Sequence, residues 1–145
     1  MAGLDRRCLL GMIMAVGAPA RPSAAADRIR IRIRDLYGHG AAFSDQALAL
    51  NEQRVQIQGF MAPPLKPDAD FFVLTKLPMA VCPFCDSELD WPNDIVLVRL
   101  RGRQDWVDFN QPIVVTGTLA LGTEIDAATG FVSRVRLVDA NFELG

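Results

Sequence analysis

The chain has 145 residues with a formal net charge of −2, and 50% of its residues are hydrophobic. This length suits one domain with one hydrophobic core. Nucleic-acid binding normally requires a basic face, which a net-acidic chain lacks, so we expect no nucleic acid among the partners of this protein.

Residues 1–26 have the three parts of an export signal. Arg6 and Arg7 form a basic start, a short apolar run follows, and small residues end at Ala26. The apolar run is too short to remain as a membrane anchor, which needs about 20 apolar residues. The arginine pair resembles a twin-arginine signal, although Asp5 stands where Ser or Thr is usual. We therefore expect cleavage after Ala26, a periplasmic or secreted location, no integral membrane segment after cleavage, and a single domain over residues 27–145.

Residues 28–34 alternate between arginine and isoleucine, which predicts a strand with one apolar face and one solvated face. The four arginines are interpreted as solvent-facing, with an anion site as the alternative. A glycine-flanked loop containing His39 follows. Ser44 is then placed to cap a short helix that extends to Leu50.

Five further segments are rich in Val, Ile, Phe or Leu and are bounded by Gly, Pro, Asp or Asn, which predicts strands at 54–60, 71–77, 95–101, 113–119 and 131–138. Gly59 inside the first of them indicates a bulge or a sharp bend. Short strands at this spacing, with one convincing helix, predict an all-β protein. We expect a small five- or six-stranded barrel resembling the OB fold.

The motif Cys82-Pro83-Phe84-Cys85 carries the main chemical signal. Such a motif suits a thiol-disulfide oxidoreductase if it opens a helix that lowers the pKa of the first thiol. The nine residues that follow, 86–94, have no helical apolar stripe and include Pro92. Their several carboxylates would raise a neighbouring thiol pKa. The redox function therefore remains only an alternative.

Metal binding is the second interpretation of this motif. Cys82 and Cys85 have the spacing of two thiolate ligands in zinc sites, and His39 is the one histidine of the chain. Met79 precedes Cys82 by three residues and would add a soft donor for copper(I). The candidate metal ligands are therefore Cys82, Cys85 and His39, with zinc or copper as the ion.

A structural disulfide is the third interpretation. Export would remove Cys8 with the signal and leave Cys82 and Cys85, which normally pair in an oxidising compartment. A Cys82–Cys85 disulfide would close a very small ring, so it would stiffen the loop more than the fold. In that case the protein is a non-catalytic interaction module.

No other residues form a recognisable catalytic set. The serines lie in no nucleophile motif, a single histidine argues against a Ser-His-Asp triad, and no phosphate-binding glycine loop is present. We name no catalytic residue, and an enzyme is the less favoured class of function.

One stretch of the sequence resembles a known family. Residues 54–65 contain Gly59-Phe60-Met61 and a proline pair, and they are followed by the strand segment 71–74 and the cysteine loop. This pattern resembles a family of small exported bacterial proteins with a conserved domain of unknown function, over about residues 35–140. Many members carry Cys-x-His where this chain has Cys82-Pro83-Phe84-Cys85.

The resemblance implies a function other than catalysis. Members of the family are often encoded near ABC-type transporter components, some of them in zinc-responsive clusters. This implies a periplasmic accessory protein with ABC-type transporter components as partners and a role in metal handling. We therefore expect a metal-binding or transport-associated protein that acts through the Cys82–Cys85 loop.

Overall fold

The structure is a computed structural model, and it describes residues 28–63, 70–80 and 92–145. The segments expected to hold the export signal and the Cys82–Cys85 motif lie outside these residues. The elements in chain order are β1 (Ile29–Arg30), the 3-10 helix η1 (Ile33–Leu36), α1 (Asp45–Ala49), β2 (Arg54–Met61), β3 (Phe71–Thr75), β4 (Ile95–Leu100), β5 (Pro112–Ile125) and β6 (Val132–Leu144).

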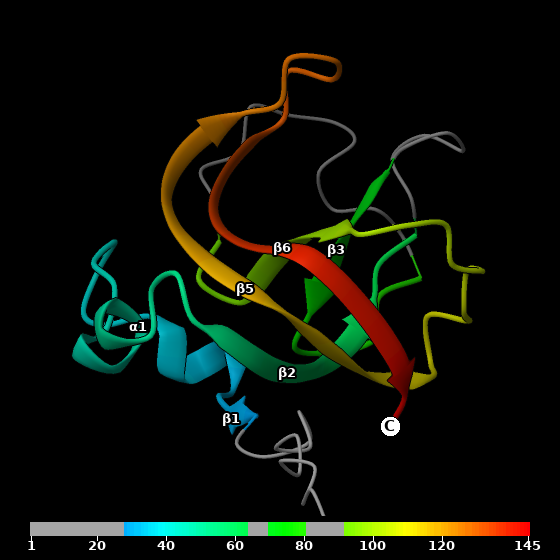
Figure 1. Ribbon diagram of the computed structural model, residues 1–145, viewed down its shortest axis with the longest axis horizontal. Coiled ribbons are helices and arrows are strands. Elements are labelled where there is room, and N and C mark those ends of the chain that lie inside the picture. Colours follow the sequence, from blue (N-terminus) through cyan, green and yellow to red (C-terminus); the bar gives the residue numbers. More distant parts are fainter. Residues whose placement is uncertain (1–27, 64–69, 81–91) are drawn as a thin grey trace, which may run out of the picture.

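Five of the strands form a ring. The sheet order is β1-β2-β3-β4-β6-β5, and an additional pairing between β2 and β5 joins the ring (Figure 1). Within the ring only β4 and β6 are parallel, and β1 runs parallel to the start of β2. This order and the single parallel pair within the ring match an OB-type barrel. The prediction of a small all-β barrel with a short helix is confirmed.

The barrel interior holds one large hydrophobic core. It takes side chains from every strand of the ring, with Phe72, Ile57 and Leu137 among the largest that are fully buried. Leu36 of η1 and Ala47 of α1 join the same core, so the two helical turns are fixed to the barrel by burial. Ser44 caps α1 as predicted, because its hydroxyl accepts a 3.0 Å hydrogen bond from the Ala47 amide.

A second, smaller apolar cluster lies outside this core. Val73 of β3 and Ile95 of β4 pack with Ala62, and Phe131 adds its ring from the β5–β6 connection. The ring of Phe131 also contacts Phe71, with 5.8 Å between centroids. All of β3 and the first four residues of β4 are therefore buried on both faces.

Gly59 lies between the part of β2 that pairs with β1 and the part that pairs with β3. Strand β2 pairs with β3 only through Phe60 and Met61, so this seam is the shortest in the ring. A Cβ atom on Gly59 would lie 2.7 Å from the carbonyl oxygen of Thr75 and 2.9 Å from Cγ of Leu74. The register of β2 against β5 runs without a shift from Arg54 to Phe60. The glycine therefore permits a close approach of β3 rather than a bulge in β2.

The first strand is shorter than the alternating residues predict. Regular pairing covers only Ile29 and Arg30, and the chain then turns into η1. Ile31 and Ile33 are buried nonetheless, and Leu36 is fully buried one turn of the 3-10 helix later. A three-residue period lets Ile33 and Leu36 face the core together, so burial favours the helical turn over a longer strand.

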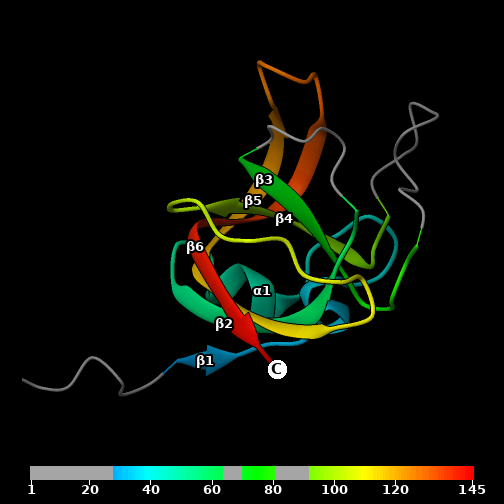
Figure 2. The ribbon, with the colours of Figure 1, turned by 90° about the vertical axis from the view of Figure 1, so that its right-hand side faces the viewer.

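Strands β5 and β6 are longer than predicted. Their antiparallel pairing continues to Ile125 and Val132, with register shifts near Gly117 and between Leu121 and Glu124. The resulting hairpin extends beyond the barrel, as the orange segment in Figure 2 shows. Its polar residues still pair through the backbone, whose hydrogen bonds do not depend on apolar side chains.

Candidate functional site

Of the three candidate ligands Cys82, Cys85 and His39, only His39 lies within the described residues. It lies exposed in a tight loop between Tyr37 and Phe43, which form an antiparallel bridge. The amide of Gly38 donates to the carbonyl of Ala42 at 2.9 Å and closes the loop. The imidazole is therefore presented to solvent by a loop with a defined backbone.

The shape of this loop depends on its glycines. Gly40 has a φ of 62°, a conformation that a residue with a Cβ atom adopts only with strain. A Cβ on Gly38 would lie 3.2 Å from the carbonyl oxygen of Phe43. The two glycines beside His39 thus permit the tight turn that holds it.

Contacts on two sides fix the His39 loop to the barrel. The hydroxyl of Tyr37 donates to the carbonyl of Ile95 at 2.6 Å, at the start of β4. On the other side, Arg134 of β6 donates to the carbonyl of Ala41, and its guanidinium carbon lies 4.9 Å from the ring centroid of Phe43. The charge over the ring adds a cation–π attraction to the hydrogen bond.

A further contact joins the His39 loop to the end of the cysteine-bearing connection between β3 and β4. The side-chain amide of Asn93 donates to the carbonyl of Gly40 at 2.9 Å. Asn93 follows Cys85 by eight residues in the sequence. His39 is therefore attached, through its neighbour, to the chain that leaves the Cys82–Cys85 motif.

The start of the same connection lies beside its end. The Lys76 amide donates to the carbonyl of Asp94 at 3.3 Å, and the Thr75 hydroxyl donates to the carbonyl of Leu77 at 2.7 Å. Met79, which precedes Cys82 by three residues, is half-buried. The two ends of the connection and the His39 loop thus meet at one end of β4.

The described residues do not test the predicted metal site. Cys82 and Cys85 lie outside the described residues, so their pairing as a disulfide and their distance to His39 remain predictions. Within the described residues, no group of three or more His, Cys, Asp or Glu side chains is placed to hold a metal ion. His39 supplies one donor, and a metal centre would require the two thiolates as well.

A network of charged side chains, which the sequence did not reveal, lies on the outer face of β4 and β6. Arg99 contacts Glu124 at 3.2 Å and Asp126 at 3.0 Å, and Nε of Arg136 lies 3.3 Å from the Glu124 carboxylate. Arg136 also donates to the carbonyl of Gly122 at 2.7 Å. These contacts bind the extended β5–β6 hairpin to the barrel.

The electrostatics of this network are those of a structural clamp. Arg136 is 6% exposed, and its burial lowers the pKa of the guanidinium, while the charge of Glu124 opposes that change. The hydroxyl of Thr129 donates to Asp126 and lowers the pKa of that carboxyl, and Arg99 acts in the same direction. The two arginines and two carboxylates balance, so the network itself has no net charge.

A second feature is a polar groove beside β1, lined by Arg30, Gln58 and neighbouring residues, in the region where the sequence offered an anion site only as the alternative. The signal available in the sequence was the pair Gln56 and Gln58, two residues apart and flanking Ile57 in the strand. A two-residue spacing places both amides on one face of β2.

Comparisons with known proteins give one structural relative. No family model matches this chain, and no curated protein matches it. A crystal structure of a DUF3299 family protein from Pseudomonas aeruginosa is similar, with a TM-score of 0.54 and 16% sequence identity. The similarity covers 83% of this chain and 97% of the other.

This likeness establishes a shared fold. The relative belongs to a domain family designated as of unknown function, which agrees with the coarse form of the resemblance drawn from the sequence. Within the described residues no helix has both the length and the apolar character needed to cross a membrane.

Proposed function

We propose that this chain is an exported periplasmic accessory protein that binds zinc or copper through Cys82, Cys85 and His39. The observation that carries the proposal is the hydrogen bond from Asn93 to the carbonyl of Gly40. It fixes the loop of the single histidine to the chain that follows the cysteine pair. Thiolate and imidazole together suit zinc or copper better than a hard cation.

The position of His39 fits a ligand. Its side chain is exposed, and its loop is fixed by Tyr37, Asn93 and Arg134, so a metal would meet an imidazole on a pre-ordered backbone. Asn93 follows Cys85 by eight positions, and such a segment can turn back or extend by up to about 27 Å. The covalent chain therefore permits the thiolates to reach His39.

The decisive experiment is metal analysis combined with thiol counting on protein purified from its native compartment. We expect about one zinc or copper ion per reduced chain. The double variant C82S/C85S should lose the metal, and H39A should bind it at least about tenfold more weakly. A quantitative Cys82–Cys85 disulfide with no metal would refute the proposal, and reduction of an external disulfide substrate would favour the oxidoreductase alternative.

An accompanying control separates metal ligation from loop packing. The N93A variant keeps all three proposed ligands but removes the bond that fixes the His39 loop. We expect it to weaken metal binding less than H39A does. Equal affinity of H39A and the unmodified protein would remove His39 from the ligand set and leave the cysteines alone.

A transport-associated role is proposed on the family resemblance and on the expected export. ABC-type transporter components are the expected partners. Crosslinking of the exported protein in intact cells, followed by identification of the bound chains, tests this role. Recovery of transporter components with the unmodified protein, and their loss with C82S/C85S, would connect the partner to the metal loop.

A further inference from the structure

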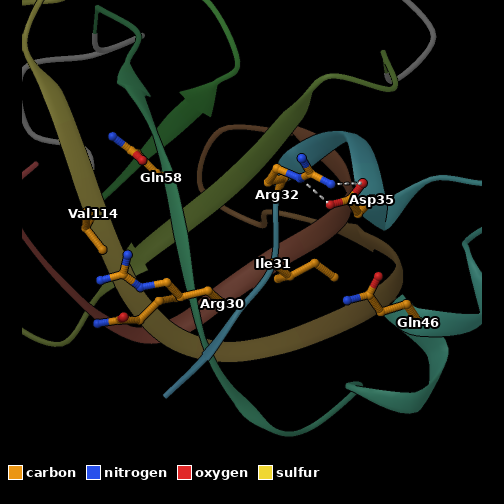
Figure 3. A pocket seen from close by; sticks show the side chains of 8 residues that line it. Arg30, Ile31, Arg32, Asp35, Gln46, Gln58 and Val114 are labelled. Atoms are coloured by element: carbon orange, nitrogen blue, oxygen red, sulfur yellow. Dashed lines mark hydrogen bonds and ion pairs between the residues drawn. The ribbon is translucent and has the colours of Figure 1, made fainter. Parts of the chain in front are cut away.

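A groove of about 450 Å³ lies on the outer surface where β1 and η1 meet β2 and β5. Figure 3 shows Arg30 extending along the strands toward Val114, with Gln58 on the neighbouring strand and Gln46 on the far side of Ile31. This volume falls in the range of sites for small molecules. The groove is separate from the His39 loop and its metal proposal.

The charges that line the groove leave one cation available. Nε of Arg32 donates to the Asp35 carboxylate at 2.7 Å, so that pair is internally satisfied, as the dashed lines in Figure 3 show. Arg32 and Arg34 lower the pKa of Asp35, with the hydrogen bond from Arg32 as the main cause. Arg30 makes no ion pair with any residue that the structure describes. The groove therefore has an excess of one positive charge.

The remaining polar groups of the groove are neutral amides. Gln46 and Gln58 are exposed, and each offers both a donor and an acceptor. Gln56 is 7% exposed, and its amide nitrogen donates to the Thr116 hydroxyl at 3.2 Å, which fixes this side chain in the wall. Such a wall suits hydroxyl or amide groups of a ligand better than a second charge.

Strand pairing explains why the groove is open. Strand β1 pairs with β2 at Val55 and Gln56, whereas β3 pairs with β2 at Phe60 and Met61. The intervening residues 57–59 have no described strand partner on that edge of β2. The groove lies beside this gap, with Gln58 in its wall.

We propose that this groove binds a small monocarboxylate that also carries hydroxyl or amide groups. The guanidinium of Arg30 pairs with the carboxylate, while Gln46 and Gln58 hydrogen-bond to the neutral groups. The Arg32–Asp35 pair is an example, in the same groove, of a guanidinium that donates a hydrogen bond to a carboxylate. A dianion is disfavoured because Arg30 is the one cation of the lining without an ion pair among the described residues, so a second negative charge would have no partner there.

The test is a titration of the full-length protein, with the side-chain amide signals of Gln46 and Gln58 followed by NMR. Glucuronate is the hydroxyl-bearing probe and N-acetylalanine the amide-bearing probe, so their two arms distinguish the source of the ligand. Glucose and N-acetylalanine amide are the matched neutral compounds. We expect saturable shifts with at least one acid and at least about tenfold weaker binding of its neutral partner.

Two matched variants test whether Arg30 is the positive charge that binds the acid. R30Q removes the proposed carboxylate partner, and R103Q makes the same charge change at an exposed position that does not line the groove. We expect R30Q to weaken binding of the acid about tenfold or more and R103Q to leave it unchanged. Both positions are exposed, so neither variant should alter the far-UV circular dichroism spectrum.

Three outcomes would overturn the proposal. The first is the absence of saturable shifts with either acid at concentrations up to about 10 mM, which we take as the weakest dissociation constant of a specific site. The second is equal loss of binding in R30Q and R103Q. The third is inorganic phosphate binding as tightly as the acids, which would reveal a general anion site. None of these outcomes depends on metal binding by the cysteines.

Discussion

The substitution Gly59→Ala tests the seam that joins β2 to β3. The added Cβ would lie 2.7 Å from the Thr75 carbonyl oxygen, 2.9 Å from Cγ of Leu74 and 3.0 Å from its Cδ1. Two of these atoms belong to a side chain that is fully buried, and the third is backbone, so none can move away freely. Overpacking of this kind costs about 1–3 kcal/mol.

The seam has little pairing to absorb that cost. It consists of two register pairs, Phe60 with Thr75 and Met61 with Leu74. The hydroxyl of Thr75 also donates to the carbonyl of Phe60 at 3.2 Å. Displacement of Thr75 would weaken this bond as well, so we expect the free energy of unfolding to fall by about 2–3 kcal/mol.

Thermal and urea unfolding measure the effect, with Gly102→Ala as the matched control. A Cβ at Gly102 would meet no atom within 4 Å, so this change should alter stability by less than about 0.5 kcal/mol or raise it slightly. For a domain of this size, a loss of 2–3 kcal/mol lowers Tm by roughly 6–12 °C. Equal Tm values for the two variants would refute the close-approach argument.

Three further predictions concern single contacts. Asp126→Asn should make stability less dependent on pH in acid. The pKa of Asp126 is lowered in the folded state, so this carboxylate stabilises the fold above about pH 4, and the contribution is lost as the pH falls through the folded-state pKa. Tm measured from pH 6 to pH 2.5 should therefore fall less steeply in the variant. Tyr37→Phe should cost about 0.5–1.5 kcal/mol in urea unfolding, because the 2.6 Å bond to the Ile95 carbonyl is lost, and an unchanged value would show that the bond adds nothing to stability. Ser44→Ala should cost about 1 kcal/mol through loss of the helix cap, whereas Ser44→Thr should retain most of the stability.

Much of the barrel was predictable because its signals are local. Apolar strand segments between turn residues located β2, β3 and β4 to within a few residues, and the Ser44 cap located α1. The errors fall where backbone pairing, rather than side-chain pattern, decides the structure. The β5–β6 hairpin continues through Glu124 and Ser133 because the strands pair there whatever their side chains.

The sites were less predictable because they depend on contacts far apart in the sequence. Nothing in the residues around His39 indicates that the Gly40 carbonyl accepts a bond from Asn93, 53 positions away. The groove likewise requires the register of β1 against β2, which places Arg30 opposite Gln56. Alternating arginines predict a polar face, but only the pairing decides which amides lie beside them.

The seam gives a structural meaning to the most distinctive part of the sequence. Gly59-Phe60-Met61 supplies the close approach at Gly59 and both residues that pair with β3. Strand β3 leads directly into the connection that bears Cys82 and Cys85. The single proton of the Thr75 hydroxyl is shared between two carbonyl acceptors, Leu77 at 2.7 Å at the start of that connection and Phe60 at 3.2 Å in the seam. A damaged seam should therefore disturb the position of the cysteine connection as well as stability. If G59A lowers metal affinity while G102A does not, at a temperature where both are folded, then the motif supports the proposed metal site through the barrel.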